Sequence, residues 1–370
     1  MKIALVHDWL VNLSGAERVL IELHKIFPDA PIYTLFENKK FTSQYFPDVE
    51  IRPSFLQNIP GITKYYKYFF FLMPTAIESW DLSDFDVVIS SSAIFSKGLV
   101  LKPKTKHICY CYSPTRQLWD LNSLNHSSHP KLYVISQHLL RIWDRQASDR
   151  VDKFLAISNH VRDRIKKYYR RDAEVIYPPV SIESRIMNNE LRIGNHNSKF
   201  IINNSGGYYL IVSRLFPHKN IDIAIEAFNK LNLPLVIIGE GPEYRNLESK
   251  IVNHELIQFL GFIPDKELPY YYQNCRAFIM SQEEDFGITP IEAMSYGKPV
   301  LALRKGGAVE TVVEGVTGEF FDDPIPEGLA DGIRRLNENY LKYNPETIKN
   351  HVQKFSSERF KEEILRLVNN

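Results

Sequence analysis

The stretch Tyr208-Tyr-Leu-Ile-Val-Ser-Arg-Leu-Phe-Pro-His-Lys-Asn-Ile-Asp-Ile-Ala-Ile-Glu-Ala-Phe228 decides the fold class. Its first six residues, 208–213, form a short apolar run that predicts a buried strand, and apolar residues at helical spacing begin near Ile221. The turn between them contains two cations, Arg214 and Lys219. A buried strand followed closely by an amphipathic helix is the repeating unit of α/β folds.

The same alternation recurs along the chain. Strands are predicted at 2–6, 86–90, 107–110, 154–157, 235–238, 277–280 and 299–303, and helices at 15–27, at 159–168 and from near Ile221, Pro242, Asp265 and Pro290. A polar stretch rich in Asn and Gly, 181–207, is interpreted as the connection between two domains.

We therefore predict an α/β protein of two successive doubly wound domains, 1–185 and 186–356. Ligands of such sheets bind beyond the carboxyl ends of the strands, and we expect them here in a cleft between the domains. The amphipathic final segment, 357–370, is a candidate to pack back on the first domain.

Composition excludes several classes of protein. The net charge of +1 over 370 residues lacks the global electrostatic footprint of a nucleic-acid binder. Three cysteines are too few for a disulfide framework and fit a reducing compartment. The apolar run 1–6 is too short for a signal peptide, and the longest apolar cluster, 68–73, is far shorter than a membrane span. We expect a cytoplasmic protein that is soluble or peripheral to a membrane.

Two segments are candidates for contact with an anionic membrane. Residues 64–73 interleave aromatic side chains with lysines, and residues 162–171 form a second basic stretch. Such segments can lie on a membrane surface beside a lipid-linked acceptor. The alternative is an aromatic core element with solvated lysines, and the sequence leaves both interpretations open.

A pair of carboxylates, Glu284 and Glu292, flanks a glycine and a proline. Pro290 cannot lie within a helix that begins before Glu284, because it lacks an amide donor and its ring would clash with the preceding turn. Thr289 to Glu292 has the form of a capping box, which would place Glu284 in a loop and Glu292 in the first helical turn. Helix capping alone, with a solvated Glu284, is the competing interpretation.

Two turns that follow strands are typical of anion binding. Arg214 and Lys219 precede a helix whose expected N-cap is Asn220, and phosphates favour fixed positive charge near free helical amides. The segment 304–307, Arg-Lys-Gly-Gly, also opens a helix and would let backbone amides approach an anion. The alternatives are a basic surface turn and an ordinary helix entry.

Taken together, these motifs resemble glycosyltransferase family 4. The resemblance covers nearly the whole C-terminal half in order and spacing, through segments 210–219, 237–242, 259–261, 284–287, 291–294 and 297–300. It implies the GT-B fold, in which two Rossmann-like domains face each other, and a retaining transfer of sugar from a nucleotide-sugar donor.

The resemblance also implies roles for matching residues. Arg214 and Lys219 would bind the donor diphosphate and stabilise the leaving group, Glu284 would contact the transferred sugar, and Glu292 would bind the ribose hydroxyls. Arg214, Lys219 and Glu284 are therefore the expected catalytic residues, and no metal is expected. Further donor contacts are expected from Ser213, Phe262, Phe286, Gly287 and Ile288.

The N-terminal half resembles the bacterial mannosyltransferases of O-antigen and capsule assembly, whose usual donor is GDP-mannose. This similarity lies in segments 14–17, 84–90, 110–120 and 150–159, and it places Asp8, Gly15, Tyr112, Arg116 and Ser158 on the acceptor side. His7 and Asp8 could equally form a structural pair.

Two departures from that subgroup are visible. Ser14-Gly15 stands where a glycine pair is expected, and Ser14 with Glu17 also forms an ordinary capping box. Tyr112 stands where relatives often carry a histidine, and a tyrosine is a poor base near neutral pH.

By family analogy, the transfer is expected to proceed by front-face attack, in which the departing phosphate takes the acceptor proton. A covalent intermediate on Glu284 is the weaker alternative.

Two rival functions are a GT-B epimerase, which needs no acceptor, and a non-catalytic sugar-nucleotide binding protein. Two further motifs are discounted: Asp84-Phe-Asp86 as a metal pair, because turn carboxylates commonly precede strands, and Gly239-Glu-Gly241 as a dinucleotide fingerprint, because the third glycine is missing.

Overall fold

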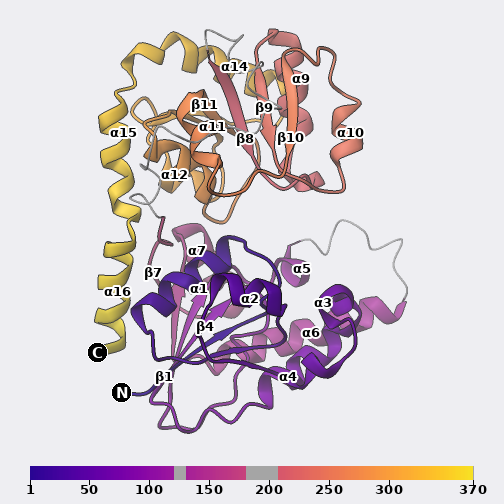
Figure 1. Ribbon diagram of the computed structural model, residues 1–370, viewed down its shortest axis with the longest axis vertical. Helices are drawn as coiled ribbons and strands as arrows, with labels where there is room; N and C mark the ends of the chain where they lie inside the picture. Colours follow the sequence, from indigo (N-terminus) through magenta and orange to yellow (C-terminus); the bar gives the residue numbers. More distant parts are fainter. Residues whose placement is uncertain (121–130, 181–206, 370) are drawn as a thin grey trace. The chain divides into compact units, whose positions relative to one another are not determined.

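The computed structural model describes residues 1–120, 131–180 and 207–369. They form two compact units: unit 1 comprises 1–179 with 357–370, and unit 2 comprises 180–356. The predicted connection, 181–207, lies outside the described residues except for Gly207. Each unit is built around one parallel sheet (Figure 1).

Unit 1 contains a seven-stranded sheet in the order β3-β2-β1-β4-β5-β6-β7. All neighbouring strands are parallel. The strands are β1 (Ile3–His7), β2 (Ile32–Thr34), β3 (Ile51–Pro53), β4 (Val87–Ser92), β5 (Lys106–Cys111), β6 (Lys153–Ala156) and β7 (Ala173–Val175).

Unit 2 repeats this topology with a six-stranded parallel sheet in the order β10-β9-β8-β11-β12-β13. Its strands are β8 (Tyr208–Val212), β9 (Leu235–Ile238), β10 (Ile257–Gly261), β11 (Cys275–Met280), β12 (Val300–Leu303) and β13 (Gly318–Phe321). Both orders follow the doubly wound pattern, in which the direction of winding reverses once near the middle of the sheet.

Helices connect the strands in both units. In unit 1 they are α1 (Gly15–Ile26), α2 (Lys39–Tyr45), η1 (Phe55–Asn58), α3 (Ile62–Tyr65), η2 (Tyr66–Leu72), α4 (Met73–Glu78), α5 (Arg116–Trp119), α6 (Lys131–Asp149), α7 (Asn159–Tyr169) and α16 (Ser357–Asn369). In unit 2 they are η5 (Pro217–Lys219), α9 (Ile221–Leu231), α10 (Tyr244–Glu248), α11 (Leu268–Asn274), α12 (Ile288–Ser295), α13 (Ala308–Thr311), α14 (Pro326–Glu338), η6 (Tyr340–Lys342), α15 (Pro345–Val352) and η7 (Gln353–Phe355).

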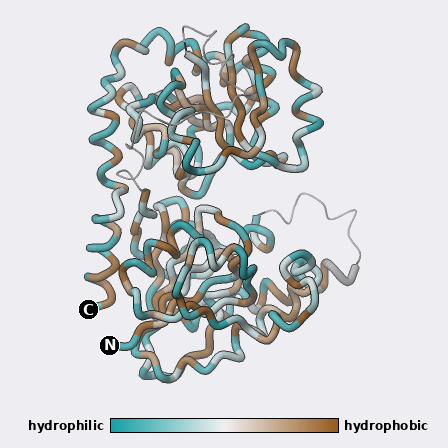
Figure 2. The backbone as a smooth tube through the Cα atoms, in the orientation of Figure 1, coloured by the Kyte–Doolittle hydropathy of each residue, from teal (hydrophilic) through white to brown (hydrophobic). Residues whose placement is uncertain are grey.

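The cores lie along the central strands. Every residue of β4 in unit 1 and of β9 in unit 2 is buried, as expected for parallel strands covered on both faces. Figure 2 shows hydrophobic colouring along the strands of unit 2. The final helix, α16, packs on unit 1, where the ring of Phe360 lies 5.6 Å from that of Tyr110.

The sequence patterns located most central strands within two residues, but they missed β2, β3, β7, β10, β13 and the long helix α6. The strands β2, β3 and β7 have only three residues each, too few to show a period. Pro74 lies in the first turn of α4, where a missing amide costs nothing. No helix of the described residues is long and apolar enough to cross a membrane.

Buried His107 predicts a pH dependence of stability. Burial lowers the pKa of this side chain from 6.5 to about 4, while its Nε2 lies 2.8 Å from Ser90 Oγ. The unfolded chain therefore binds a proton first as the pH falls through 6.5, and the folded state loses stability from there down to the folded pKa near 4. The cost should reach about 2 kcal/mol near pH 5. Denaturant unfolding at a series of pH values measures it.

The control for this prediction is a second histidine. Between neutral pH and about pH 5, His107→Gln should lose less stability than the wild-type protein. His254→Gln changes an exposed histidine and should keep the wild-type dependence. Identical pH profiles for all three proteins would contradict the assignment to His107.

Candidate active site

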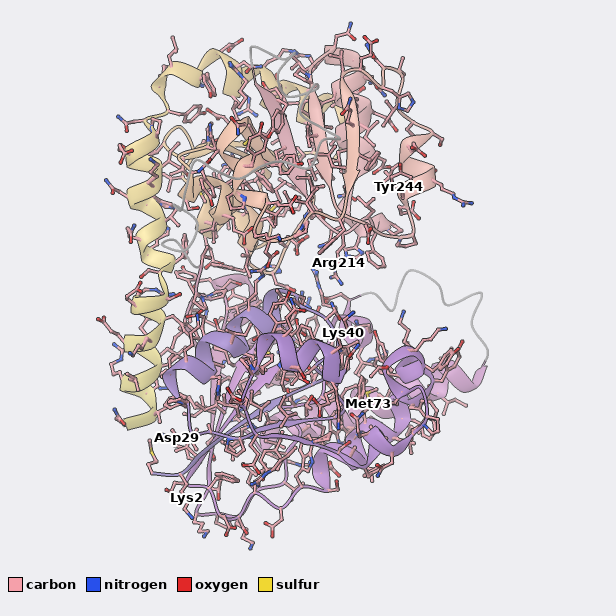
Figure 3. All side chains as sticks on the ribbon, viewed as in Figure 1. Lys2, Asp29, Lys40, Met73, Arg214 and Tyr244 are labelled. Carbon is pink, nitrogen blue, oxygen red and sulfur yellow. The ribbon has the colours of Figure 1, made fainter. Side chains whose placement is uncertain are left out.

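The winding of unit 2 reverses between β8 and β11, which are neighbours in the sheet although β9 and β10 lie between them in sequence. Loops that follow such a pair of strands diverge and leave room for a ligand. Here they are tied together at their base, because Ser281 Oγ donates a hydrogen bond to Lys219 O at 2.9 Å. Figure 3 shows Arg214 at the end of unit 2 where its strands finish.

Lys219 and Glu284 form an ion pair across these two loops. The lysine is buried, and the carboxylate remains 24% exposed, so solvent or a ligand can reach it. Gln282 Nε2 also donates to Glu284 Oε1, at 3.0 Å. The structure thus brings together two of the three predicted catalytic residues and adds Gln282, which the sequence reasoning missed.

Arg214 is exposed and its guanidinium lies 5.6 Å from the ring centre of Phe216. Its loop is held by the loop after β9, because Leu215 N donates to Glu240 O at 2.9 Å. Gly239 has a φ of 138°, and a Cβ at this position would lie 1.9 Å from Ser213 O. The Gly239-Glu-Gly241 motif therefore serves close packing against the Arg214 loop, and its glycines need no dinucleotide to explain them.

The segment 304–307 makes structural contacts with the loops around it. Arg304 donates to both carboxylate oxygens of Glu314 and to Asp322. The amide of Gly307 donates to Glu284 O at 2.8 Å, and a Cβ on Gly306 would lie 2.2 Å from that same oxygen. These glycines therefore hold the Glu284 backbone, and the ordinary structural interpretation of this motif is favoured.

The prediction of a capping box at 289–292 is wrong. Helix α12 begins at Ile288, with Gly287 as N-cap at a φ of 90°. Pro290 is accommodated as the third helical residue, because the first four helical amides have no partner within the helix. Glu292 falls in the second turn, where it is 4% exposed and accepts a hydrogen bond from Tyr272 Oη at 2.7 Å. No sequence signal pointed to Tyr272, which lies on α11.

The other predicted donor contacts fall in different environments. Ser213 and Ile288 are half-buried, and Phe262, directly after β10, is 69% exposed. Phe286 is buried against Phe355, with ring centres 5.5 Å apart. Its ring therefore packs in the core of unit 2, and a donor contact of this residue stays a prediction.

In unit 1 the equivalent reversal, between β1 and β4, is occupied by Asp8. Both carboxylate oxygens of this buried residue accept two backbone amides each, from residues 93–96, at 2.7–2.8 Å. These contacts give Asp8 a structural role. They do not test whether Asp8 also contacts an acceptor. Asp86 likewise accepts the Lys2 amide at 2.7 Å, which favours the structural interpretation of the 84–86 motif.

Tyr112, which replaces the expected histidine, belongs to a polar network. Its hydroxyl donates to Ala16 O at 2.9 Å and lies 2.7 Å from Ser91 Oγ, which in turn lies 3.0 Å from His7 Nδ1. Burial raises the pKa of Tyr112 well above its usual value, so this hydroxyl is unsuited to accept a proton from a substrate. Its contacts fix the first turn of α1.

The opposite side of His7 faces Glu17, with Nε2 3.3 Å from Oε1. Burial acts to raise the pKa of Glu17, but the hydrogen bond and charge of His7 outweigh it and the pKa is lowered. Glu17 also accepts the Ser14 amide at 2.8 Å, as the capping interpretation predicted. His7 is thus paired with Glu17, and not with its neighbour Asp8.

The remaining acceptor-side candidates lie at helix starts. Gly15 and Arg116 are the first residues of α1 and α5, and both are half-buried. Ser158 is buried as the N-cap of α7 and accepts the Val161 amide at 3.0 Å. Within the described residues, no group of three or more His, Cys, Asp or Glu is arranged to hold a metal ion.

Comparison with known proteins matches both halves of the chain to families. A model described as Glycosyltransferase Family 4 matches residues 13–184, and one described as Glycosyl transferases group 1 matches residues 194–361. The chain belongs to the glycosyltransferases. The resemblance to family 4 is thereby confirmed at the level of its domains.

Two relatives and one solved structure are similar to this chain. The alpha-1,3/1,6-mannosyltransferase ALG2 of Candida glabrata is 28% identical, with 97% of this chain and 90% of that protein covered. An uncharacterised glycosyltransferase of Methanocaldococcus jannaschii is 30% identical, with 59% and 60% covered. The crystal structure of Anabaena HepE in complex with UDP superimposes with a TM-score of 0.71 at 19% identity, with both chains fully covered. The predicted GT-B class, with its two parallel Rossmann-like sheets, is confirmed.

Proposed function

We propose that this glycosyltransferase transfers mannose from GDP-mannose to a glycan or lipid-linked saccharide during the synthesis of a bacterial surface polysaccharide, at the cytoplasmic face of the membrane. The observation that carries the proposal is the Lys219–Glu284 ion pair at the reversal of unit 2, with exposed Arg214 on the adjoining loop. Ligands of doubly wound sheets bind at such reversals.

The charges of this site fit a sugar diphosphate. Arg214 and Lys219 offer two cations on one short loop, which would offset the negative charge that grows on the diphosphate as its bond to the sugar breaks. Lys219 and Gln282 hold the Glu284 side chain in place, and its exposed side can accept hydrogen bonds from sugar hydroxyls. Phe262 offers an exposed aromatic surface beyond β10.

In the proposed retaining transfer, the acceptor hydroxyl attacks the anomeric carbon on the face from which the diphosphate departs. The bond between that carbon and the phosphate oxygen breaks, and the departing phosphate takes the acceptor proton. The protein then contributes positioning and electrostatic stabilisation. The high pKa of Tyr112 agrees with a mechanism that needs no base at this position.

The mannosyl assignment draws on the ALG2 relatives, which are mannosyltransferases, whereas the HepE structure holds UDP. GDP-mannose should raise the melting temperature of the protein more than UDP-glucose at equal concentration, because only a ligand that binds the folded state stabilises it. GDP and UDP serve as controls for the nucleotide alone. A larger shift with the UDP-sugar would contradict the mannosyl assignment and favour a UDP-hexose donor.

Turnover separates transfer from its rivals. Isomerised sugar in a reaction that contains donor alone would indicate an epimerase. Donor binding without turnover in the presence of membrane extracts that contain lipid-linked saccharides would indicate a non-catalytic binding protein. We expect neither, because the cations and the carboxylate that a transferase needs are all present.

A further inference from the structure

Unit 1 concentrates its exposed apolar side chains in two helical segments. Ten large apolar residues of its described part are exposed, and seven of them lie within 65–71 and 134–142. Scattered surface apolar residues need no explanation, but a contiguous group marks an interaction site.

The first segment is the 3₁₀ helix η2 with the residue before it. A 3₁₀ helix has three residues per turn, so side chains three apart line up in one row. Tyr65, Tyr68 and Phe71 form such a row and are 48%, 77% and 63% exposed. Lys64 and Lys67 form the adjacent row, and both are exposed.

The second segment is the N-terminal half of α6. Ile135, Leu139 and Ile142 follow one another at the spacing of a single helical face, and all three are exposed. Leu140 and Trp143, on the other side of the helix, pack against the core of unit 1.

One buried aromatic cluster joins the two segments. Phe95 lies 5.4 Å from Phe70 of η2 and 5.7 Å from Trp143 of α6, measured between ring centres. The two helical segments that carry the exposed rows therefore pack on the same aromatic cluster. We call the two rows together the aromatic face; its residues are Tyr65, Tyr68, Phe71, Ile135, Leu139 and Ile142.

The charges around the aromatic face have one sign. Residues 51–77 and 131–143 contain no Asp or Glu, although the chain has 44 in 370 residues. The acidic residues that follow directly are already engaged, since Asp144 pairs with buried Lys97 and Glu78 pairs with Arg150. Within the described residues, neither Lys64 nor Lys67 pairs with a carboxylate.

The other basic stretch, 162–171, does not extend this face. Arg164 is buried against Asp120, Lys166 pairs with Asp172, and Arg171 donates to three backbone carbonyls. Arg162, Lys166, Lys167 and Arg170 are exposed, so a membrane contact of this stretch stays a prediction. The apolar side chains that such a contact needs gather at 65–71 and 134–142 instead.

We propose that the aromatic face docks unit 1 on a membrane that contains anionic lipids. Tyrosine and phenylalanine enter the interface between headgroups and acyl chains, while flanking lysines are attracted to anionic headgroups. A protein partner of the same extent would tolerate acidic residues at its rim, whereas an anionic bilayer disfavours them throughout. The inference deepens the proposed function, because it would place the enzyme beside a lipid-linked acceptor.

Co-sedimentation with vesicles tests this directly. The wild-type protein should bind vesicles of phosphatidylcholine with phosphatidylglycerol, bind pure phosphatidylcholine much less, and dissociate as salt is raised. Lys64→Gln with Lys67→Gln should weaken binding about 25-fold, at about fivefold per lysine. Tyr68→Ser with Leu139→Ser should weaken binding to the anionic vesicles even at low salt, because it removes apolar contact.

Two matched variants control for charge and apolarity. Lys102→Gln with Lys104→Gln removes the same charge from exposed lysines before β5, and Leu341→Ser removes an exposed leucine from unit 2; both should bind as wild type. Equal binding to the two vesicle types, binding to neither, or equal losses in test and control variants would overturn the proposal. The assay uses neither donor nor acceptor, so its outcome is independent of whether the proposed transfer is correct.

Discussion

Replacing Lys219 with methionine is expected to lower kcat/KM for sugar transfer by about 10²- to 10³-fold, the usual effect of removing one group that stabilises charge in a transition state. Methionine keeps the length and apolar stem of lysine but removes the cation that faces Glu284. The fold should tolerate the change, because Glu284 reaches solvent and keeps its hydrogen bond from Gln282. Steady-state kinetics with GDP-mannose and a membrane-derived acceptor measure the loss.

The matched control is Lys250→Met in the same unit. Lys250 also bridges carboxylates, Asp222 and Glu226, but does so on the surface between α9 and the segment after α10. Its replacement should leave kcat/KM within about twofold of wild type, since exposed ion pairs contribute little. Comparable losses in the two variants, or full activity in Lys219→Met, would show that the ion pair is not part of the catalytic site.

The largest loss of stability is expected from Asp144→Ala, at about 3–5 kcal/mol. Asp144 is buried in α6 and lies 2.6 Å from Lys97 Nζ. It also accepts hydrogen bonds from Thr115 and Trp119 of the α5 region and from Tyr169 of α7. Burial acts to lower the pKa of Lys97, but the charge of Asp144 outweighs it and the pKa is raised. Alanine would leave a buried cation without its counter-charge.

Asp149→Ala, five residues further along the same helix, separates this effect from a general loss of charge. Asp149 pairs with Arg145 on the surface, where its side chain is 57% exposed, and its loss should cost less than about 1 kcal/mol. Denaturant unfolding of both variants, followed by tryptophan fluorescence, gives the comparison. Equal midpoints for the two variants would contradict the role of Asp144 as the centre of a buried network.

Features with a local signal could be predicted from the sequence, whereas contacts between distant residues could not. The β8 loop was predictable because a strand, a basic turn and a helix occupy one continuous stretch, and each has a local signal. The pairing of Lys219 with Glu284 joins residues 65 apart in sequence, so it required the resemblance to family 4. No local sequence pattern indicates a role for Tyr272, whose hydroxyl donates a hydrogen bond to Glu292 from another helix.

Errors arose where a local pattern had two solutions. The capping-box pattern at 289–292 was real, but Gly287 allowed the helix to begin two residues before the proposed first position. Asp8 sits at a strand end, where ligand-binding and structural carboxylates look alike in sequence. The four amides of residues 93–96 favour the structural interpretation, and an acceptor contact of Asp8 stays a prediction.

Isothermal titration of GDP-mannose into the wild-type protein, Lys219→Met and Lys250→Met tests most directly whether the reversal of unit 2 is the donor site. A hydrogen bond to a charged group is worth about 1.5–3 kcal/mol, so Lys219→Met should bind the donor at least about tenfold more weakly than the other two proteins. Equal affinity in all three proteins would contradict the account, because the donor would then bind without the cation that the site is built around.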